Sequence, residues 1–153
     1  MKAFTVSFFG HREMYDFRSI DQILEPILRD LIREKEYTSF LVGRNGDFDE
    51  YIASMIKKVK RDHGEEICEL MLVLPYNVAK VEYYENYYDS IVIPDAVYGV
   101  YPKAAIATRN RWMIEQSDLV IVNVCRNKGG AYEAKRYAEK LNKKVVNLHI
   151  HSV

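Results

Sequence analysis

The feature that most constrains the fold of this 153-residue chain is an alternation of short apolar runs with longer amphipathic segments. The apolar runs are rich in β-branched and aromatic residues, which is typical of buried strands. The segments between them repeat apolar residues every three or four positions, which is the period of a helix. Such alternation indicates a mainly parallel sheet with helices on both faces. We therefore predict a single doubly wound α/β domain over residues 1–153.

The positions of the elements follow from the same periodicity. We expect strands over residues 2–9, 39–43, 67–75, 89–97, 118–125 and 144–150. We expect helices over residues 47–62, 103–117 and 131–142, a short one within 81–90, and one along the apolar stripe from Ile20 to Ile32. Ser19 and Gln22 resemble a capping box at the start of that stripe. Since an interior proline removes a backbone hydrogen bond, Pro26 predicts that this helix begins near residue 23 or bends there.

The charge balance and the cysteines exclude several classes of protein. The 22 basic and 22 acidic residues give a net charge of zero, which offers no support for non-specific nucleic-acid binding, although a local basic pocket is compatible with it. Cys68 and Cys125 lie in apolar runs, so we expect two reduced, buried thiols in a cytoplasmic protein. No cysteine or histidine spacing typical of zinc is present, and we predict no metal and no cofactor. We also expect no membrane association, because no segment approaches the roughly 20 apolar residues of a membrane helix and no signal peptide is evident.

Glycines and polar residues follow the predicted strands. Because the carboxyl ends of parallel strands meet at one edge of a sheet, the loops that follow them converge there, where α/β sheets bind ligands. Neither GxGxxG nor GxxxxGK[ST] occurs, so ordinary dinucleotide redox binding and P-loop chemistry lose support. Free N–H groups at a helix start, together with arginines, favour phosphate. The ligand-binding residues predicted in these loops are Gly10, His11, Arg12, Gly43, Arg44, Asp47, Gly129 and Gly130.

Arg109 and Asn110 lie on a predicted helix rather than in a loop, and we add them to the ligand-binding residues. Arg109 shares a helix face with Met113, near buried surface. A buried guanidinium requires a partner, which would be a ligand phosphate or a carboxylate such as Glu133.

Each of these features also has a purely structural explanation. The glycines suit tight turns, and Asp47 suits a helix N-cap. Asp49 and Glu133 in first helical turns interact favourably with the helix dipole whether or not they contact a ligand. In "VEYYENYYDS", Tyr84 and Tyr88 share one helix face and Tyr83 and Tyr87 another, which suits core packing, a base-stacking platform or a protein contact.

Five stretches taken together resemble one family: "FFGHR", "FLVGRNGDFDEYIA", "VLPY", "RNRWMIEQSDLVIVNV" and "GGAYEAKRYA". In order and over nearly the whole chain, they are similar to the YpsA-like branch of the SLOG superfamily, which is related to DprA and to the LOG enzymes. The resemblance implies a Rossmann-like sheet that binds a nucleotide or a nucleotide-derived ligand, such as an ADP-ribose-like or NAD-derived molecule. It also implies self-association into a homo-oligomer and a role as sensor or adaptor in a bacterial stress or conflict pathway.

The resemblance also raises an enzymatic alternative. LOG enzymes are phosphoribohydrolases, and Arg109 and Met113 match their R-x-x-x-M helix, whereas the second motif is incomplete after Gly129 and Gly130. The same stretch resembles nucleoside deoxyribosyltransferases, in which a glutamate at a helix start attacks the anomeric carbon. In that alternative Glu133 is the nucleophile of an N-glycosidic bond hydrolase and Asp47 or Asp49 supplies the second carboxyl group.

A third hypothesis is an interaction protein whose pocket is vestigial.

Overall fold

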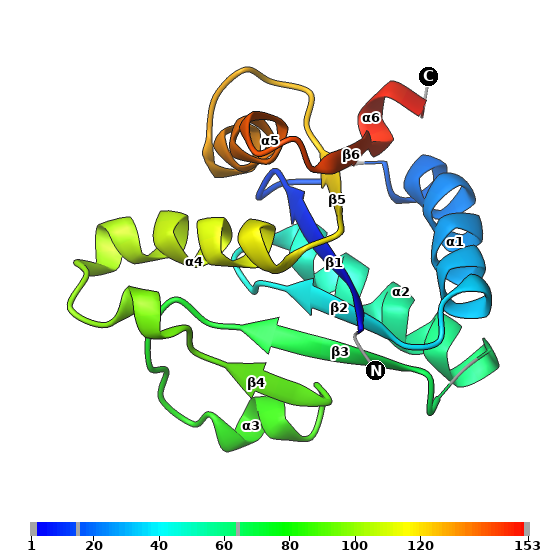
Figure 1. Cartoon of the computed structure of the whole chain (residues 1–153), viewed down its shortest axis with the longest axis horizontal. Coiled ribbons are helices and arrows are strands. Elements are labelled where there is room, and N and C mark those ends of the chain that lie inside the picture. Colours follow the sequence, from blue (N-terminus) through cyan, green and yellow to red (C-terminus); the bar gives the residue numbers. More distant parts are fainter. Residues whose placement is uncertain (1–2, 15, 64, 152–153) are drawn as a thin grey trace.

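The structure is a computed structural model that describes residues 3–14, 16–63 and 65–151, and it is built on one six-stranded sheet (Figure 1). The strands are β1 (Phe4–Gly10), β2 (Thr38–Val42), β3 (Cys68–Val73), β4 (Ser90–Val92), β5 (Leu119–Asn123) and β6 (Lys144–Asn147). Their order in the sheet is β4-β3-β2-β1-β5-β6, and all neighbouring pairs are parallel. The prediction of a doubly wound parallel α/β fold is therefore confirmed.

Helices cover both faces of this sheet (Figure 1). They are α1 (Phe17–Glu34), α2 (Asp47–His63), α3 (Glu82–Glu85), α4 (Pro102–Gln116), α5 (Gly130–Lys140) and α6 (Leu148–His151), with a 3₁₀ turn over Asp95–Val97. On one face α1 and α2 pack against one apolar cluster, and on the other α4 and α5 pack against a second. Successive residues of a strand alternate between the two clusters: Phe8 belongs to the first and Phe9 to the second. The continuous apolar runs of the sequence reflect this burial on both faces.

The order of the strands places a topological switch point beside β1. From β1 the chain moves through β2 and β3 to β4 at one edge, and α4 then carries it back to β5 on the other side of β1 (Figure 1). Connections leave β1 and β5 in opposite directions, so a crevice forms beyond the carboxyl ends of these two strands.

Helix α1 differs from its predicted form. It begins at Phe17 rather than near residue 23, and Asp16 caps it by accepting a hydrogen bond from the Ser19 N–H at 3.1 Å. The predicted capping box of Ser19 and Gln22 is therefore wrong. The helix continues through Pro26 to Glu34, because the buried stripe of Leu24, Leu28 and Ile32 outweighs one missing hydrogen bond.

Three further expectations are corrected. The last strand ends at Asn147, whose Oδ1 accepts from the His149 N–H at 3.1 Å and turns the chain into α6. The fourth strand has only three residues, and the 3₁₀ turn follows it. Cys68 is buried, and burial raises the pKa of its thiol to about 11, whereas Cys125 is exposed because β5 ends two residues earlier. Within the described residues, no helix is long and apolar enough to span a membrane.

Candidate functional site

A cleft of about 230 Å³ lies at the switch point and contains most of the predicted ligand-binding residues. We call it the switch-point cleft. Its wall comes from the loop after β1, the β2–α2 loop, one face of α4 and the start of α5. The predicted residues that line it are Gly10, His11, Arg12, Asp49, Arg109, Asn110, Gly129 and Gly130. Asn45, Gly46 and Arg126 also line it, in the same strand-end loops, but were not among the predicted ligand-binding residues.

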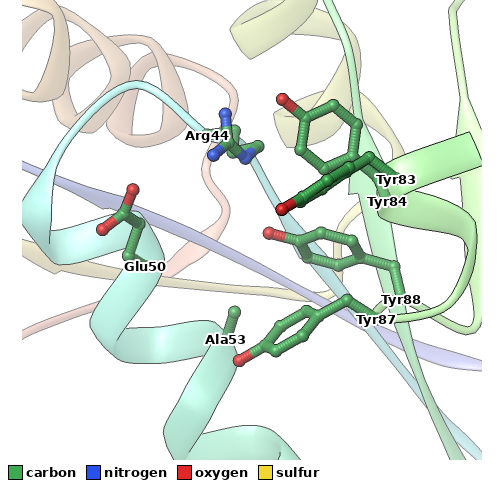
Figure 2. A pocket seen from close by; sticks show the side chains of 7 residues that line it. All are labelled: Arg44, Glu50, Ala53, Tyr83, Tyr84, Tyr87 and Tyr88. Carbon is green, nitrogen blue, oxygen red and sulfur yellow. The ribbon is translucent and has the colours of Figure 1, made fainter. Parts of the chain in front are cut away.

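The other predicted residues do not line this cleft. Gly43 is buried next to Arg109, and Asp47 accepts a long hydrogen bond from the Met14 N–H at 3.4 Å. Arg44 lines a different cavity together with tyrosines of the α3 region (Figure 2). Glu133 is exposed on α5 and lines a third cavity, of about 740 Å³, beside α4.

Arg109 is the central polar side chain of the switch-point cleft and is only 3% exposed. Its Nη1 donates to the backbone carbonyl of Val73 at 2.9 Å, its Nη2 to Oδ1 of Asn45 at 2.8 Å and its Nε to Oδ1 of Asn110 at 2.9 Å. The partners found in the structure are neutral oxygens rather than Glu133. Three of the five guanidinium N–H groups are thereby used, and Arg109 holds the ends of β2 and β3 against α4.

Close packing at two glycines explains how these groups approach one another. A Cβ on Gly43 would lie 3.0 Å from Nη1 of Arg109, so glycine lets the guanidinium reach the strand end. A Cβ on Gly10 would lie 2.2 Å from the ring of Phe48, which is a severe clash. Both residues therefore have a packing role at the base of the cleft.

His11 joins the two loops that flank the switch point. Its Nε2 accepts hydrogen bonds from the backbone N–H of Cys125 at 3.0 Å and of Arg126 at 3.3 Å. A nitrogen that accepts carries no proton, so these bonds require the neutral imidazole. Burial lowers the pKa of His11, and the charges of Arg126 and His149 lower it further.

Asp49 is the acidic group of the switch-point cleft. It is half-buried, and its Oδ2 accepts from the Asn45 N–H at 2.9 Å. Burial raises the pKa of this carboxyl group, although the Asn45 hydrogen bond and the charge of Arg109 oppose the shift. A carboxyl group with a raised pKa in a cleft is a candidate for proton transfer.

The start of α5 forms the opposite wall and is open. Gly129 has a φ of 98°, which favours glycine, and a Cβ on Gly130 would have no atom within 4 Å. Within the described part of the chain, no side chain caps this helix start. The N–H groups of the first turn have no partner inside a helix, and the helix dipole adds partial positive charge. Together with Arg12 and Arg126, this wall suits an anionic group such as phosphate.

Comparisons with known proteins agree with the fold. No protein-family model and no curated protein match the chain. The X-ray structure of DNA processing protein A (DprA) from Streptococcus pneumoniae superposes with a TM-score of 0.66 and 15% identity, over 94% of this chain and 49% of that one. DNA processing protein A from Helicobacter pylori, a structure described for its single-stranded DNA binding mode, gives 0.61 and 18%, over 93% and 63%. The chain shares the Rossmann-like fold of these proteins and spans less than two thirds of their length.

Proposed function

We propose that the chain binds a nucleotide or a nucleotide-derived ligand, ADP-ribose-like or NAD-derived, with a phosphate at the start of α5. The observation that carries this proposal is the open, uncapped start of α5 in a cleft that Gly130, Arg12 and Arg126 all line. Backbone N–H groups, a helix dipole and arginines form the standard recognition set for phosphate. The chain shares its fold with two DprA proteins, and the one from Helicobacter pylori is described as binding single-stranded DNA. This likeness supports a nucleotide-related ligand.

The finer assignment rests on the sequence motifs. We propose that the chain is one YpsA-like SLOG domain over residues 1–153, self-associates and serves as a sensor or adaptor in a bacterial stress or conflict pathway. A binding role suits the way Arg109 is used, because this arginine holds loops in place rather than presenting its whole guanidinium to a ligand.

A thermal-shift panel tests the binding proposal. The full chain is heated with AMP, ADP-ribose, NAD and deoxynucleoside monophosphates, and the Arg126→Ala variant is run beside it. We expect at least one nucleotide to raise Tm, because a ligand that binds only the folded state stabilises it by mass action. The shift should shrink in Arg126→Ala and persist in Arg61→Ala, which alters an exposed arginine in the last turn of α2. A panel without any shift would overturn the proposal.

The second candidate is hydrolysis of an N-glycosidic bond in a nucleotide. It is favoured by the raised pKa of Asp49 and by the position of Glu133, whose cavity shares Arg12, Asn110 and Gly130 with the switch-point cleft. One ligand can therefore extend from Asp49 toward Glu133. Chromatography for free base after incubation with each nucleotide distinguishes the candidates. Release that is lost in Glu133→Gln and Asp49→Asn indicates an enzyme, whereas a thermal shift without release indicates a sensor.

A further inference from the structure

A second cavity, of about 330 Å³, lies on the other side of the β2–α2 loop (Figure 2). We call it the tyrosine pocket; it is lined by Arg44, Glu50, Ala53, Tyr83, Tyr84, Tyr87 and Tyr88. Arg44 and Glu50 face this pocket, whereas Asn45 and Asp49 beside them in the sequence face the switch-point cleft. The loop and the first turn of α2 therefore form a wall between two separate cavities.

The tyrosines of this pocket are only partly used for core packing. Tyr88 is 7% exposed and belongs to the core, but Tyr83 is 77% exposed. The rings hold one another by edge contacts, with centroids 5.0 Å apart for Tyr87 and Tyr88 and 6.3 Å apart for Tyr83 and Tyr84. The result is a cluster of aromatic rings that stays open to solvent, which is the usual character of a site for a flat ligand.

The charges around the pocket disfavour a cationic ligand. The guanidinium of Arg44 lies 4.4 Å from the ring centroid of Tyr84, and the ammonium of Lys57 lies 3.8 Å from that of Tyr87. Two ring faces are thus already occupied by cations of the protein, and a quaternary ammonium would meet both of them. A neutral ring stacks on tyrosine and arginine planes without this repulsion.

The polar groups of the pocket suit the edge of a base. In Figure 2 the hydroxyl groups of Tyr83, Tyr84 and Tyr88 extend toward the side of Arg44, and the Glu50 carboxylate lies across the pocket on α2. An ionised carboxylate only accepts hydrogen bonds. It therefore selects a ring that presents adjacent N–H donors, as guanine does with its ring N–H and amino group, over adenine, whose amino group neighbours an acceptor.

We propose that the tyrosine pocket is a second binding site that takes a nucleobase, with guanine preferred, stacked against the exposed ring of Tyr83 and held at its donor edge by Glu50. The site is independent of the switch-point cleft. The base can belong to a free nucleotide or to a single strand of nucleic acid, and the recognition chemistry is the same in both cases.

Isothermal titration calorimetry on the full chain tests this proposal with four probes: GMP, AMP, a short guanine-containing single-stranded DNA, and choline. We expect GMP or the DNA to bind, GMP more tightly than AMP, and choline not at all. Binding of GMP alone indicates a free nucleotide, and binding of the DNA alone indicates a strand. Binding of choline, or of none of the probes, would overturn the proposal.

Variants locate the site. Tyr83→Ala should weaken binding of the base roughly 5- to 160-fold, the range for loss of one stacking contact. Glu50→Gln should remove the preference for GMP over AMP. Tyr101→Ala is the matched control, because Tyr101 is 83% exposed at the start of α4 and outside the pocket. If Arg126→Ala abolishes GMP binding while Tyr83→Ala has no effect, the base binds in the switch-point cleft and the assignment to the tyrosine pocket is wrong.

Discussion

Arg109 joins parts of the chain that lie far apart in sequence. It bonds Val73 at the end of β3 and Asn45 after β2, and Gly43 leaves the space that its guanidinium needs. Arg109 is therefore a positioning residue for the switch-point cleft. In the proposed complex, direct contact with phosphate would come from the backbone of α5 and from the more exposed Arg12 and Arg126.

Gly130→Ala separates a binding role of the Gly129–Gly130 turn from a purely structural one. A Cβ at Gly130 meets no atom within 4 Å, and the residue begins a helix, so we expect the variant to be about 0.4–1 kcal/mol more stable toward urea. The same methyl group stands where a phosphate would approach the helix start, so nucleotide affinity should fall about tenfold. Chemical denaturation and calorimetry measure the two quantities. If the variant gains stability and keeps full affinity, Gly130 serves only the turn.

His11 makes stability depend on pH. Its pKa is lower in the folded chain than its ordinary value of 6.5 because burial opposes the charged form, so the folded state takes up fewer protons than the unfolded state below that pH. The contribution of His11 is thus complete above pH 6.5 and decreases as the pH falls through the folded pKa.

Urea denaturation between pH 5 and 8 checks this prediction about His11. At pH 7.5, His11→Gln should lower the free energy of unfolding by at most about 1–2 kcal/mol, because an amide oxygen keeps part of the acceptor role. As the pH falls, the free energy of unfolding of the variant should decrease less steeply than that of the wild type. His63→Gln, an exposed histidine in the last turn of α2, is the control and should retain the slope of the wild type. An unchanged slope in His11→Gln would mean that Nε2 is not the relevant acceptor.

The site residues were predictable from the sequence to different degrees. Gly10, His11 and Gly129 line one cleft, as expected for residues at or shortly after the carboxyl ends of parallel strands, and their role in ligand binding stays a prediction. The hydrogen-bond partners of Arg109 were not predicted, because one of them is the backbone carbonyl of Val73 at the end of β3, and every residue type has such a carbonyl. Arg44 and Asn45 both follow β2, yet Arg44 faces the tyrosine pocket and Asn45 faces the switch-point cleft. Only the path of the loop decides which cavity each side chain faces.

At the level of elements, helix α1 shows where periodicity and local rules conflict. The apolar stripe correctly predicted its buried face, while Pro26 suggested a later start or a bend. The true cap, Asp16, lies before the stripe begins and leaves no periodic signal. Similarly, the apolar run after Lys144 continues past the end of β6, because Asn147 turns the chain without interrupting the hydrophobic pattern.

Pro26→Ala should stabilise the protein. Alanine restores a backbone N–H inside α1 and has a far better helix propensity, while proline restricts the unfolded chain, so we expect a net gain of about 1–3 kcal/mol. The midpoint of urea denaturation measures it, with Gln22→Ala at an exposed position of the same helix as the control. A lower midpoint in Pro26→Ala would indicate that α1 packs around a bend that proline favours.

At the level of the whole molecule, the alternation of strands and helices was sufficient for the fold class but not for the order of the strands. Right-handed crossovers restrict the possible orders, yet the return to the far side of β1 depends on α4 packing against α5 on the second face. That return creates the switch point. Once the order is known, the position of the cleft follows from the general rule for open α/β sheets.

The links across the cleft predict how the whole molecule responds to ligand. His11 connects the loop after β1 to the loop after β5, and the Asp47 N–H connects the β2–α2 loop to the loop after β1 by donating to the Arg12 carbonyl at 2.7 Å. Arg109 connects the β2–α2 loop to α4 and β3. A nucleotide at the start of α5 should therefore slow amide hydrogen exchange together in residues 11–14, 43–47 and 125–132, because the loops share these hydrogen bonds. At a concentration about 100 times Kd, the ligand stabilises the folded state by about 2.7 kcal/mol, which is enough to slow the opening of all three segments.

Exchange measured by mass spectrometry, with the nucleotide that gives the largest thermal shift, checks this response. Residues 20–32 of α1 serve as the internal reference, because they line neither the switch-point cleft nor the tyrosine pocket. In Gly130→Ala, the protection of all three loops should decrease together at the same ligand concentration. Protection confined to residues 82–88 would instead place the nucleotide in the tyrosine pocket, and protection of a single loop would show that the hydrogen bonds of His11 and Arg109 do not couple the strand ends.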